Sequence, residues 1–449
     1  MPPPSGRPEP RTHRRRRSSK AEERTELTET VDTQAAELDR PEAQQSTDLW
    51  LLLGGSTVSR LGSISVTMAF PLLALEANFS PAFAGAVTAA GILPILLMYP
   101  LAGVLADRFD RRKIMIYSQL ARALVFMLLG AGLAGSAGHR LLMVLLPLAA
   151  ALDGVFLTLY NTAEIAAFPR LFPPKETATL KAVSKSEAQN HGALALGRPL
   201  SGFLCGAGSA YPFAFGAATT LISVLTLTKI EKNRFRMDRC GKRHTTPIRE
   251  AVTWLRSDKP MRRAMMVCTI TNLLFQAIIL LLIIMAKKNG FPHAFIGILL
   301  AASGVGGMLV ACTAPRLLYR ISLSRVSTIC TWIWLLLTLT LLISDHPIVL
   351  VAAWFGVGFV GGHMNVALTA YQARSVPERL RGRVAGLKSF ATRAPSAIGA
   401  LMAGLVISML DTQAVIWSVF ITMVLLTCAV TYDHLTSIGR SQNVVEGAL

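Results

Sequence analysis

The chain has 449 residues, of which 52% are apolar and 16% are charged, and its formal net charge is +19. Soluble domains usually contain about a quarter charged residues, so this composition excludes an ordinary soluble protein and indicates a membrane protein. The positive charge does not indicate nucleic-acid binding, because no RNA- or DNA-binding motif is present and the basic residues gather between long apolar runs.

The segment 1–47 is polar and poor in aromatic residues. Its basic stretch "RTHRRRRSSK" is followed by a largely acidic one, and no apolar core of a signal peptide follows within the segment. We therefore expect residues 1–47 to form a disordered arm on the cytoplasmic side of the membrane.

Apolar runs then follow one another almost without interruption, and each is long enough to cross the hydrocarbon core as a helix of about 20 residues. Continuous runs such as "LLFQAIILLLIIMA" (273–286) exclude a β-barrel, whose strands are about ten residues long and alternate in polarity. The sequence thus predicts an all-α membrane protein with twelve transmembrane helices. We expect these spans at 49–74, 82–105, 113–135, 140–168, 182–207, 211–229, 264–286, 293–314, 324–343, 347–372, 383–408 and 412–432.

Lysine and arginine are distributed unevenly between the gaps that separate the runs. With the N-terminus inside, the even-numbered gaps face the cytoplasm and hold most of the basic residues, whereas the opposite side holds Arg140, Lys287 and Lys288. This bias sets the orientation of a membrane protein. It predicts a multi-pass protein of the cell membrane with both termini in the cytoplasm and with anionic lipids at the cytoplasmic face.

The runs divide into two sets of six, separated by a basic link. Within the link, apolar residues at helical spacing (Ile248, Val252 and Leu255) predict a short helix at the cytoplasmic surface. We expect an N-terminal six-helix bundle at 48–229, a cytoplasmic link at 230–263, a C-terminal six-helix bundle at 264–432 and a cytoplasmic tail at 433–449.

The two halves resemble each other at one place in the sequence. "PKETATLKAVSKSEA" from Pro174 aligns with "PERLRGRVAGLKSFA" from Pro377 at an offset of 203 residues. This supports two homologous bundles. Transporters built from such repeats place their substrate site between the halves, near the middle of the membrane.

The loop between the second and third spans reads "GVLADRFDRRK". Here the chain resembles the major facilitator superfamily, whose G-x-x-x-D-R-x-x-R-R loop signature is matched by Gly103, Asp107, Arg108, Arg111 and Arg112. The resemblance implies a conformational latch, in which Asp107 sits at the positive N-terminal end of the eleventh span in one access state and leaves it in the other.

Two further stretches resemble a narrower branch, the exporters that include enterobactin and macrolide efflux proteins. These are "AAFPRLFPPKETATLKAVSKSEAQN" after the fourth span and "VPERLRGRVAGLKS" at the entry to the eleventh. The resemblance implies a fold of two rocking bundles in which the first, fourth, seventh and tenth spans line the central cavity.

Charged residues inside the membrane are costly, so each is a functional candidate. We expect Asp153, or else Glu164 or Glu187, to take up and release a proton while pairing in turn with Arg60 or Arg198. The alternative is that these charges only hold helices together. Arg393 in the eleventh span is a further candidate for proton coupling or substrate binding.

Uncharged polar groups on the spans expected to line the cavity could complete the site. They are Tyr160, Asn272, Gln276, His363, Asn365 and Tyr371. The sequence also departs from its family: the acid that often follows the glycine of the first span is absent, since Ser63 stands there, and Arg198 interrupts a fifth-span pattern that is usually rich in glycine and proline.

No motif for a P-loop, a metal site or a nucleophilic serine is present, so the sequence predicts neither an enzyme nor a cofactor. We expect a monomeric secondary transporter that exports a small organic molecule, such as a drug, an antibiotic or a siderophore, by proton antiport. Two alternatives stay open: a uniporter or importer of a nutrient, and a membrane sensor or assembly partner that transports nothing.

Overall fold

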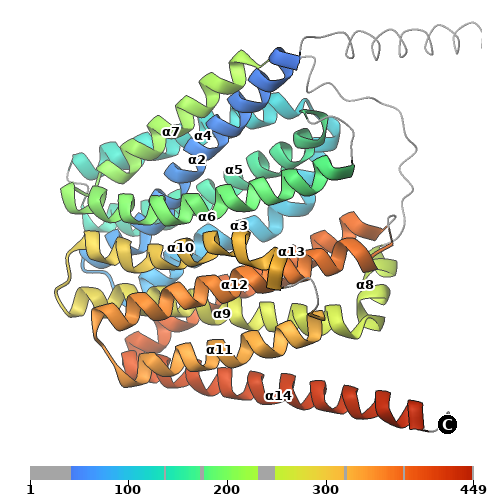
Figure 1. Ribbon diagram of the computed structural model, residues 1–449. Coiled ribbons are helices and arrows are strands. Elements are labelled where there is room, and N and C mark those ends of the chain that lie inside the picture. Colours follow the sequence, from blue (N-terminus) through green and yellow to red (C-terminus); the bar gives the residue numbers. More distant parts are fainter. Residues whose placement is uncertain are drawn as a thin grey trace, which may run out of the picture. The chain divides into compact units, whose positions relative to one another are not determined.

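The computed structural model describes residues 42–135, 138–171, 176–230, 248–317, 321–377 and 380–446. Within these ranges the side-chain environments of 42–49, 99–100, 103–104, 106–108, 166, 168–190, 248, 311, 315–316, 381 and 437–446 lie outside the description. All regular structure in the described residues is helical, and Figure 1 labels its elements.

The first half of the described chain contains six long helices. They are α2 (Glu42–Glu76), α3 (Pro81–Arg108), α4 (Arg111–Ala134), α5 (His139–Leu171), α6 (Glu176–Ala207) and α7 (Tyr211–Lys229). A short helix, α8 (Ile248–Ser257), follows and confirms the helix predicted in the basic link. Residues 231–247 of that link lie outside the described residues.

The second half contains six more long helices. They are α9 (Lys259–Lys288), α10 (His293–Leu317), α11 (Leu323–Ile343), α12 (Pro347–Ser375), α13 (Arg381–Met409) and α14 (Thr412–Glu446). Because α14 continues to Glu446, much of the expected tail at 433–449 is helical. Residues 1–41 of the expected arm lie outside the described residues, and 42–47 belong to α2.

Among the described residues, 11 helices are long and apolar enough to cross a membrane. The remaining expected span, 182–207, lies within α6, where side chains are described from His191 onward. Large apolar side chains such as Leu97, Leu128, Leu225 and Ile348 are more than 60% exposed, as expected of surfaces that face lipid rather than water. The prediction of an all-α membrane protein is confirmed.

The helices of each half pack mainly on one another. In the first half α5 packs on α3 and on α4, and α4 packs on α7; in the second half α9 packs on α13, α10 on α12, and α11 on α12 and α14. In the described residues, the most extensive packing between the halves is that of α6 on α10 and of α3 on α13. In Figure 1 the first-half helices, blue to green, lie above the second-half helices, yellow to red.

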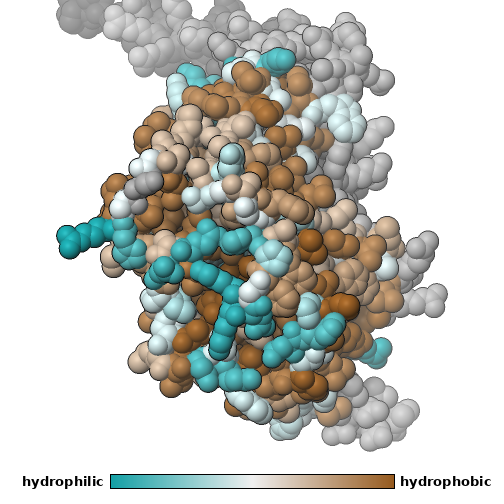
Figure 2. Space-filling view, turned by 90° about the vertical axis from the view of Figure 1, so that its left-hand side faces the viewer, coloured by the Kyte–Doolittle hydropathy of each residue, from teal (hydrophilic) through white to brown (hydrophobic). Residues whose placement is uncertain are grey.

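The helices alternate in direction, so the bundle has two ends. We call the end with the short connections after α2, α4, α6, α9, α11 and α13 the Glu76 end, and the opposite end, which carries α8, the Arg112 end. Figure 2 looks onto the Glu76 end and shows hydrophilic side chains gathered there between apolar flanks. Exposed polar residues at this end include Lys287, Lys288, Asn289, Asp345 and His346.

Glycines allow the halves to approach closely. A Cβ atom on Gly304 of α10 would lie 2.5 Å from the backbone nitrogen of Ala195 in α6, and a Cβ on Gly404 of α13 would lie 2.5 Å from the carbonyl oxygen of Pro81 in α3. Any side chain at these positions would collide with backbone. These two contacts between the halves are therefore backbone against backbone.

Candidate transport site

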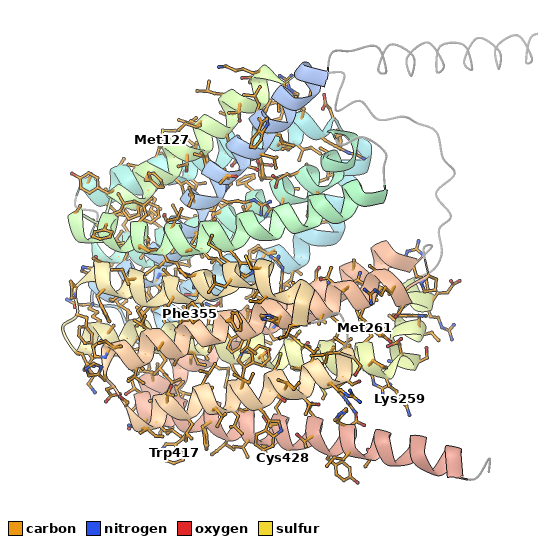
Figure 3. The ribbon with its side chains drawn as sticks, in the orientation of Figure 1. Met127, Lys259, Met261, Phe355, Trp417 and Cys428 are labelled. Atoms are coloured by element: carbon orange, nitrogen blue, oxygen red, sulfur yellow. The ribbon has the colours of Figure 1, made fainter. Side chains whose placement is uncertain are left out.

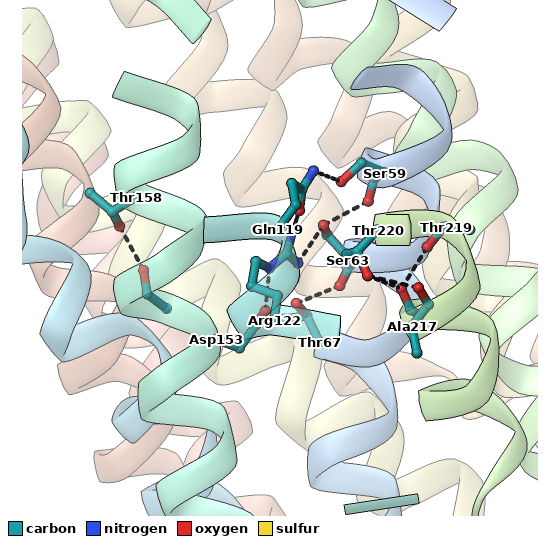
Figure 4. Close-up of polar contacts among 12 residues, drawn as sticks. Ser59, Ser63, Thr67, Gln119, Arg122, Asp153, Thr158, Ala217, Thr219 and Thr220 are labelled. Carbon is teal, nitrogen blue, oxygen red and sulfur yellow. Dashed lines mark hydrogen bonds and ion pairs between the residues drawn. The ribbon is translucent and has the colours of Figure 1, made fainter. Parts of the chain in front are cut away.

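A buried polar network lies inside the first bundle, centred on Arg122 of α4 (Figure 4). Its side chain is fully buried. Nε pairs with Oδ1 of Asp153 in α5 at 2.7 Å, Nη1 donates to Oε1 of Gln119 at 3.0 Å, and Nη2 donates to the Ser63 hydroxyl of α2 at 2.7 Å. Every nitrogen of this guanidinium has a partner, as a buried charge requires.

Gln119 extends this network to a fourth helix. Its Nε2 donates to the hydroxyls of Ser59 in α2, at 2.6 Å, and of Ser223 in α7, at 3.1 Å. The guanidinium of Arg122 also lies 5.4 Å from the ring centroid of Phe126, in cation–π range. One arginine and one glutamine thus connect α2, α4, α5 and α7.

This network corrects the expected pairing of Asp153 with Arg60 or Arg198, because the partner is Arg122. Sequence reasoning missed Arg122 and Gln119. The signal was present, since Arg122 is a charge well inside the apolar run 113–135 and the rule that selected the other intramembrane charges applies to it equally.

A second ion pair lies in the same bundle. Nη2 of Arg60 in α2 lies 2.8 Å from Oε2 of Glu164 in α5, with side-chain exposures of 16% and 1%. The other oxygen of Glu164 is buried and has no hydrogen-bond partner among the described residues. Tyr160, one turn earlier in α5, is also buried and is close enough to Glu164 and Arg60 for electrostatic interaction.

Arg198 of α6 lies between the bundles. Its Nη1 donates to the carbonyl oxygen of Leu300 at 2.5 Å and to the hydroxyl of Ser303 at 2.7 Å, both in α10. No acidic side chain in the described part of the chain pairs with it. Of the predicted charges, Asp153 and the pair Arg60–Glu164 therefore belong to one bundle, and Arg198 belongs to the interface.

The remaining predicted residues do not gather at one point. Asn272 donates to the Cys268 carbonyl of its own helix at 2.7 Å, and buried His363 contacts the Thr313 hydroxyl at 3.0 Å. Tyr371 donates to Asp258 at 3.0 Å, which ties α12 to the start of α9 at the Arg112 end. Gln276 is half-buried, Asn365 and Arg393 are exposed, and the side chain of Glu187 lies outside the description.

The loop of the family signature is described in part. Arg112 is buried, and its Nε and Nη2 donate to the carbonyls of Leu227 and Thr228 at 3.0 Å and 2.7 Å. It therefore binds the C-terminal end of α7, where a cation is favoured. Arg111 is half-buried. The latch depends on Asp107 and Arg108, whose side chains lie outside the described ones, as does the environment of Gly103.

At the Glu76 end, polar contacts join the bundles. His293 Nε2 lies 2.7 Å from Oε1 of Glu76. The backbone N–H of Ala82 donates to the Ser408 hydroxyl at 2.9 Å, and the ammonium of Lys287 contacts the Leu75 carbonyl. These contacts and the close approaches of Gly304 and Gly404 hold the halves together toward this end.

The described residues contain no group of three His, Cys, Asp or Glu side chains that could hold a metal ion. The ionisable groups described inside the first bundle are Tyr160, the pair Arg60–Glu164 and the pair Arg122–Asp153. Ionisable groups inside membrane helices are costly and are typical of functional sites.

Solved transporters share this architecture. A crystal structure of the nucleoside transporter NupG matches with a TM-score of 0.64 and 18% identity, covering 86% of this chain and 98% of NupG. A bacterial homologue of the iron transporter ferroportin, in an inward-facing state, matches with a TM-score of 0.65 and 15% identity, covering 88% of this chain and 99% of that one. The protein therefore has the fold of the major facilitator transporters.

Sequence comparison identifies the family to which the chain belongs. The profile of the transmembrane secretion effector family matches residues 44–444, so the chain belongs to that family of major facilitator transporters. An uncharacterized transporter of this superfamily from Bacillus subtilis (strain 168), YfiS, is 24% identical over 294 residues, which are 62% of this chain and 66% of YfiS, just under two thirds of its length. The resemblance to the major facilitator superfamily drawn from the loop signature is confirmed.

Proposed function

We propose that this protein exports a small organic molecule across the cell membrane by alternating access, in exchange for protons. The observation that carries the proposal is the joining of the two bundles at the Glu76 end, through α6–α10 and α3–α13. The family description, secretion effector, favours transport outward. The excess of lysine and arginine at the Arg112 end favours placing that end, and both termini, in the cytoplasm.

In this proposal the substrate enters from the Arg112 end while the Glu76 end is closed. Release to the outside requires α6 and α10 to separate. The His293–Glu76 pair and the Ser408–Ala82 hydrogen bond would then break, and water would replace them. Because these partners are polar and partly exposed, the closed and open states can lie close in free energy, as a reversible cycle needs.

Glu164 is the carboxylate best placed to carry the proton. It is almost fully buried. Among the described residues, one of its oxygens has no hydrogen-bond partner and its ion-pair partner is Arg60 on another helix. Burial disfavours a charged carboxylate and a nearby cation favours it. A small shift of α2 against α5 would therefore favour protonation. Asp153 is less suited, because Arg122 holds it in a closed network.

The test uses the purified full-length protein in liposomes with an internal pH dye. A compound that the protein transports, found by screening antibiotics and siderophores, should cause proton movement opposite to its own. Glu164→Gln should abolish this proton movement while leaving exchange of labelled for unlabelled compound intact. Asp345→Asn, which changes an exposed acid at the Glu76 end, is the matched control and should behave as wild type.

Other results of these transport assays would favour one of the alternative functions. Export that is unchanged when the proton gradient is collapsed would contradict antiport and favour a uniporter. Net uptake into cells would favour an importer. No movement of any compound, together with an Asp107→Asn variant that behaves as wild type in cells, would favour a sensor or assembly partner. We propose further that the protein works as a monomer, with anionic lipids around its basic end.

A further inference from the structure

Arg198 is a half-buried cation at the interface between the bundles, and no acid of the described residues pairs with it. We propose that it binds an acidic group of the transported molecule, so that the substrate is an amphipathic anion such as a carboxylate. This inference rests on the proposed transport function and names the chemical class of its substrate.

The charge of Arg198 stands apart from the other interior arginines. Arg122 pairs with Asp153 and Arg60 with Glu164, at 2.7 and 2.8 Å. Arg198 contacts only a carbonyl and a hydroxyl, and no described acid lies within ion-pair distance. An uncompensated charge inside a membrane protein is costly and marks a functional site. Neutralisation by a ligand removes that cost.

The guanidinium of Arg198 also has hydrogen-bond donors without a described acceptor. It carries five N–H groups in a fixed fork. Both of its hydrogen bonds to described residues start from Nη1, which leaves the N–H of Nε and those of Nη2 without a described acceptor. The Nε–Nη2 edge is the one that binds both oxygens of a carboxylate in parallel. Arg198 could therefore bind an anion while still in contact with α10.

The hydrogen bond from Arg198 to the Leu300 carbonyl of α10 can also be broken at low cost. The Leu300 carbonyl accepts a hydrogen bond from Trp354 Nε1 at 3.2 Å and another from the Ser303 hydroxyl at 3.1 Å. If Arg198 turned to a ligand, this carbonyl would keep its partners. No buried acceptor would be orphaned, which is the main cost of breaking an interior hydrogen bond.

The position of Arg198 suits a substrate site. It lies nine residues before the end of α6 at Ala207, which corresponds to about 14 Å along the helix, near the middle of a hydrocarbon core about 30 Å thick. It joins α6 of one bundle to α10 of the other. An anion that competes with Leu300 and Ser303 would loosen this join, so substrate binding would favour opening of the Glu76 end.

The test measures binding to the purified full-length protein in neutral lipid nanodiscs. The probes are 1-naphthoate and decanoate, each with its uncharged methyl ester. Wild type should bind at least one carboxylate about tenfold or more tightly than its ester, since one charge-assisted bidentate pair supplies at least that ratio. Arg198→Gln should bind acid and ester equally, with the ester affinity of wild type.

Two further variants separate recognition from a mere structural contact. Ser303→Ala removes one α10 partner but keeps the guanidinium, so the preference for the carboxylate should persist. Arg198→Lys keeps the charge without the fork, so the preference should fall but not vanish. If Arg198→Gln does not fold, the Lys variant alone decides: an undiminished preference there overturns the proposal.

The proposal is also overturned if Arg198→Gln retains the preference, or if wild type prefers neither carboxylate to its ester. Binding requires neither protons nor export. A selective binder that moves no compound would therefore contradict the proposed function alone, and an active exporter without the preference would contradict this inference alone.

Discussion

Two arginines inside the membrane-spanning helices of this protein have opposite environments. Arg122 lies within the first bundle, where Asp153, Gln119 and Ser63 occupy all three of its nitrogens. Arg198 lies between the bundles, where one nitrogen contacts α10 and no described acid is near. Inside a bundle the helices keep their neighbours through the cycle, so a charge can be compensated permanently. At the interface the neighbours change, and a permanent acid partner would oppose the motion.

The comparison predicts that Arg122 is structural and Arg198 functional. The largest expected effect is that of Arg122→Gln, which leaves Asp153 buried without a cation. Breaking a buried pair from one side costs about 3–5 kcal/mol. The unfolding midpoint in detergent should therefore fall sharply, and the yield of folded protein should fall with it.

Arg198→Gln is the matched control for that measurement. The loss of its two hydrogen bonds is offset by the removal of an uncompensated cation from the membrane interior, so we expect a change in stability of at most about 1 kcal/mol. If the two variants were equally unstable, the distinction between the two arginines would be wrong.

Removing both charges of the Arg122–Asp153 pair should restore much of the stability that Arg122→Gln loses. Arg122→Gln combined with Asp153→Asn leaves no unpaired charge, and neutral replacements of buried pairs are often tolerated. We expect the double variant to regain roughly 2 kcal/mol relative to Arg122→Gln. It should also retain proton-coupled transport, since Glu164 is the proposed carrier. Loss of coupling in a stable double variant would return Asp153 to that role.

The Arg122–Asp153 contact could have been predicted from the sequence. α4 and α5 are consecutive and antiparallel, and the two residues lie 12 residues before Ala134 and 14 residues after His139. At 1.5 Å per residue these depths are about 18 and 21 Å from the same connection, so counting from the loop would have found the pair. The spans were predictable because apolar length alone identifies a membrane helix.

The contact of Arg198 with Leu300 and Ser303 could not have been predicted from helix depths in this way. It joins helices of different bundles, and no short connection relates their depths or rotations. The same holds for His293 and Glu76. The sequence marked Arg198 as an intramembrane charge and as a departure from the family pattern, but only the packing of α6 on α10 shows that it faces the other bundle.

A smaller effect should follow from crowding the interface. In Gly304→Ala the added methyl would lie 2.5 Å from the Ala195 nitrogen and 2.8 Å from the Leu194 carbonyl carbon, both backbone atoms. Overpacking of this kind costs about 1–3 kcal/mol, and separating α6 from α10 relieves it. The variant should therefore populate the state that is open at the Glu76 end.

Cys205 of α6, which is 5% exposed, reports this opening. After Cys240 and the exposed Cys312 and Cys428 (Figure 3) are replaced by serine, a thiol reagent that cannot cross the membrane should label Cys205 about tenfold faster or more in Gly304→Ala. Gly361→Ala is the control, because its nearest neighbour would lie 3.8 Å away. Equal labelling of the two variants would mean that the α6–α10 contact does not close this end.

The smallest effect is expected at the rim of the same interface. His293→Ala removes the pair with Glu76, whose side-chain exposures are 35% and 26%. Ion pairs this accessible to water contribute no more than about 1 kcal/mol, so Cys205 labelling should rise at most about fivefold. At a pH low enough to protonate histidine, high salt should raise labelling of wild type toward that of the variant, because it screens the same pair. His346→Ala, which alters an exposed histidine at the same end, should change neither value. A rise as large as that of Gly304→Ala would assign the closure to the ion pair instead of to backbone packing.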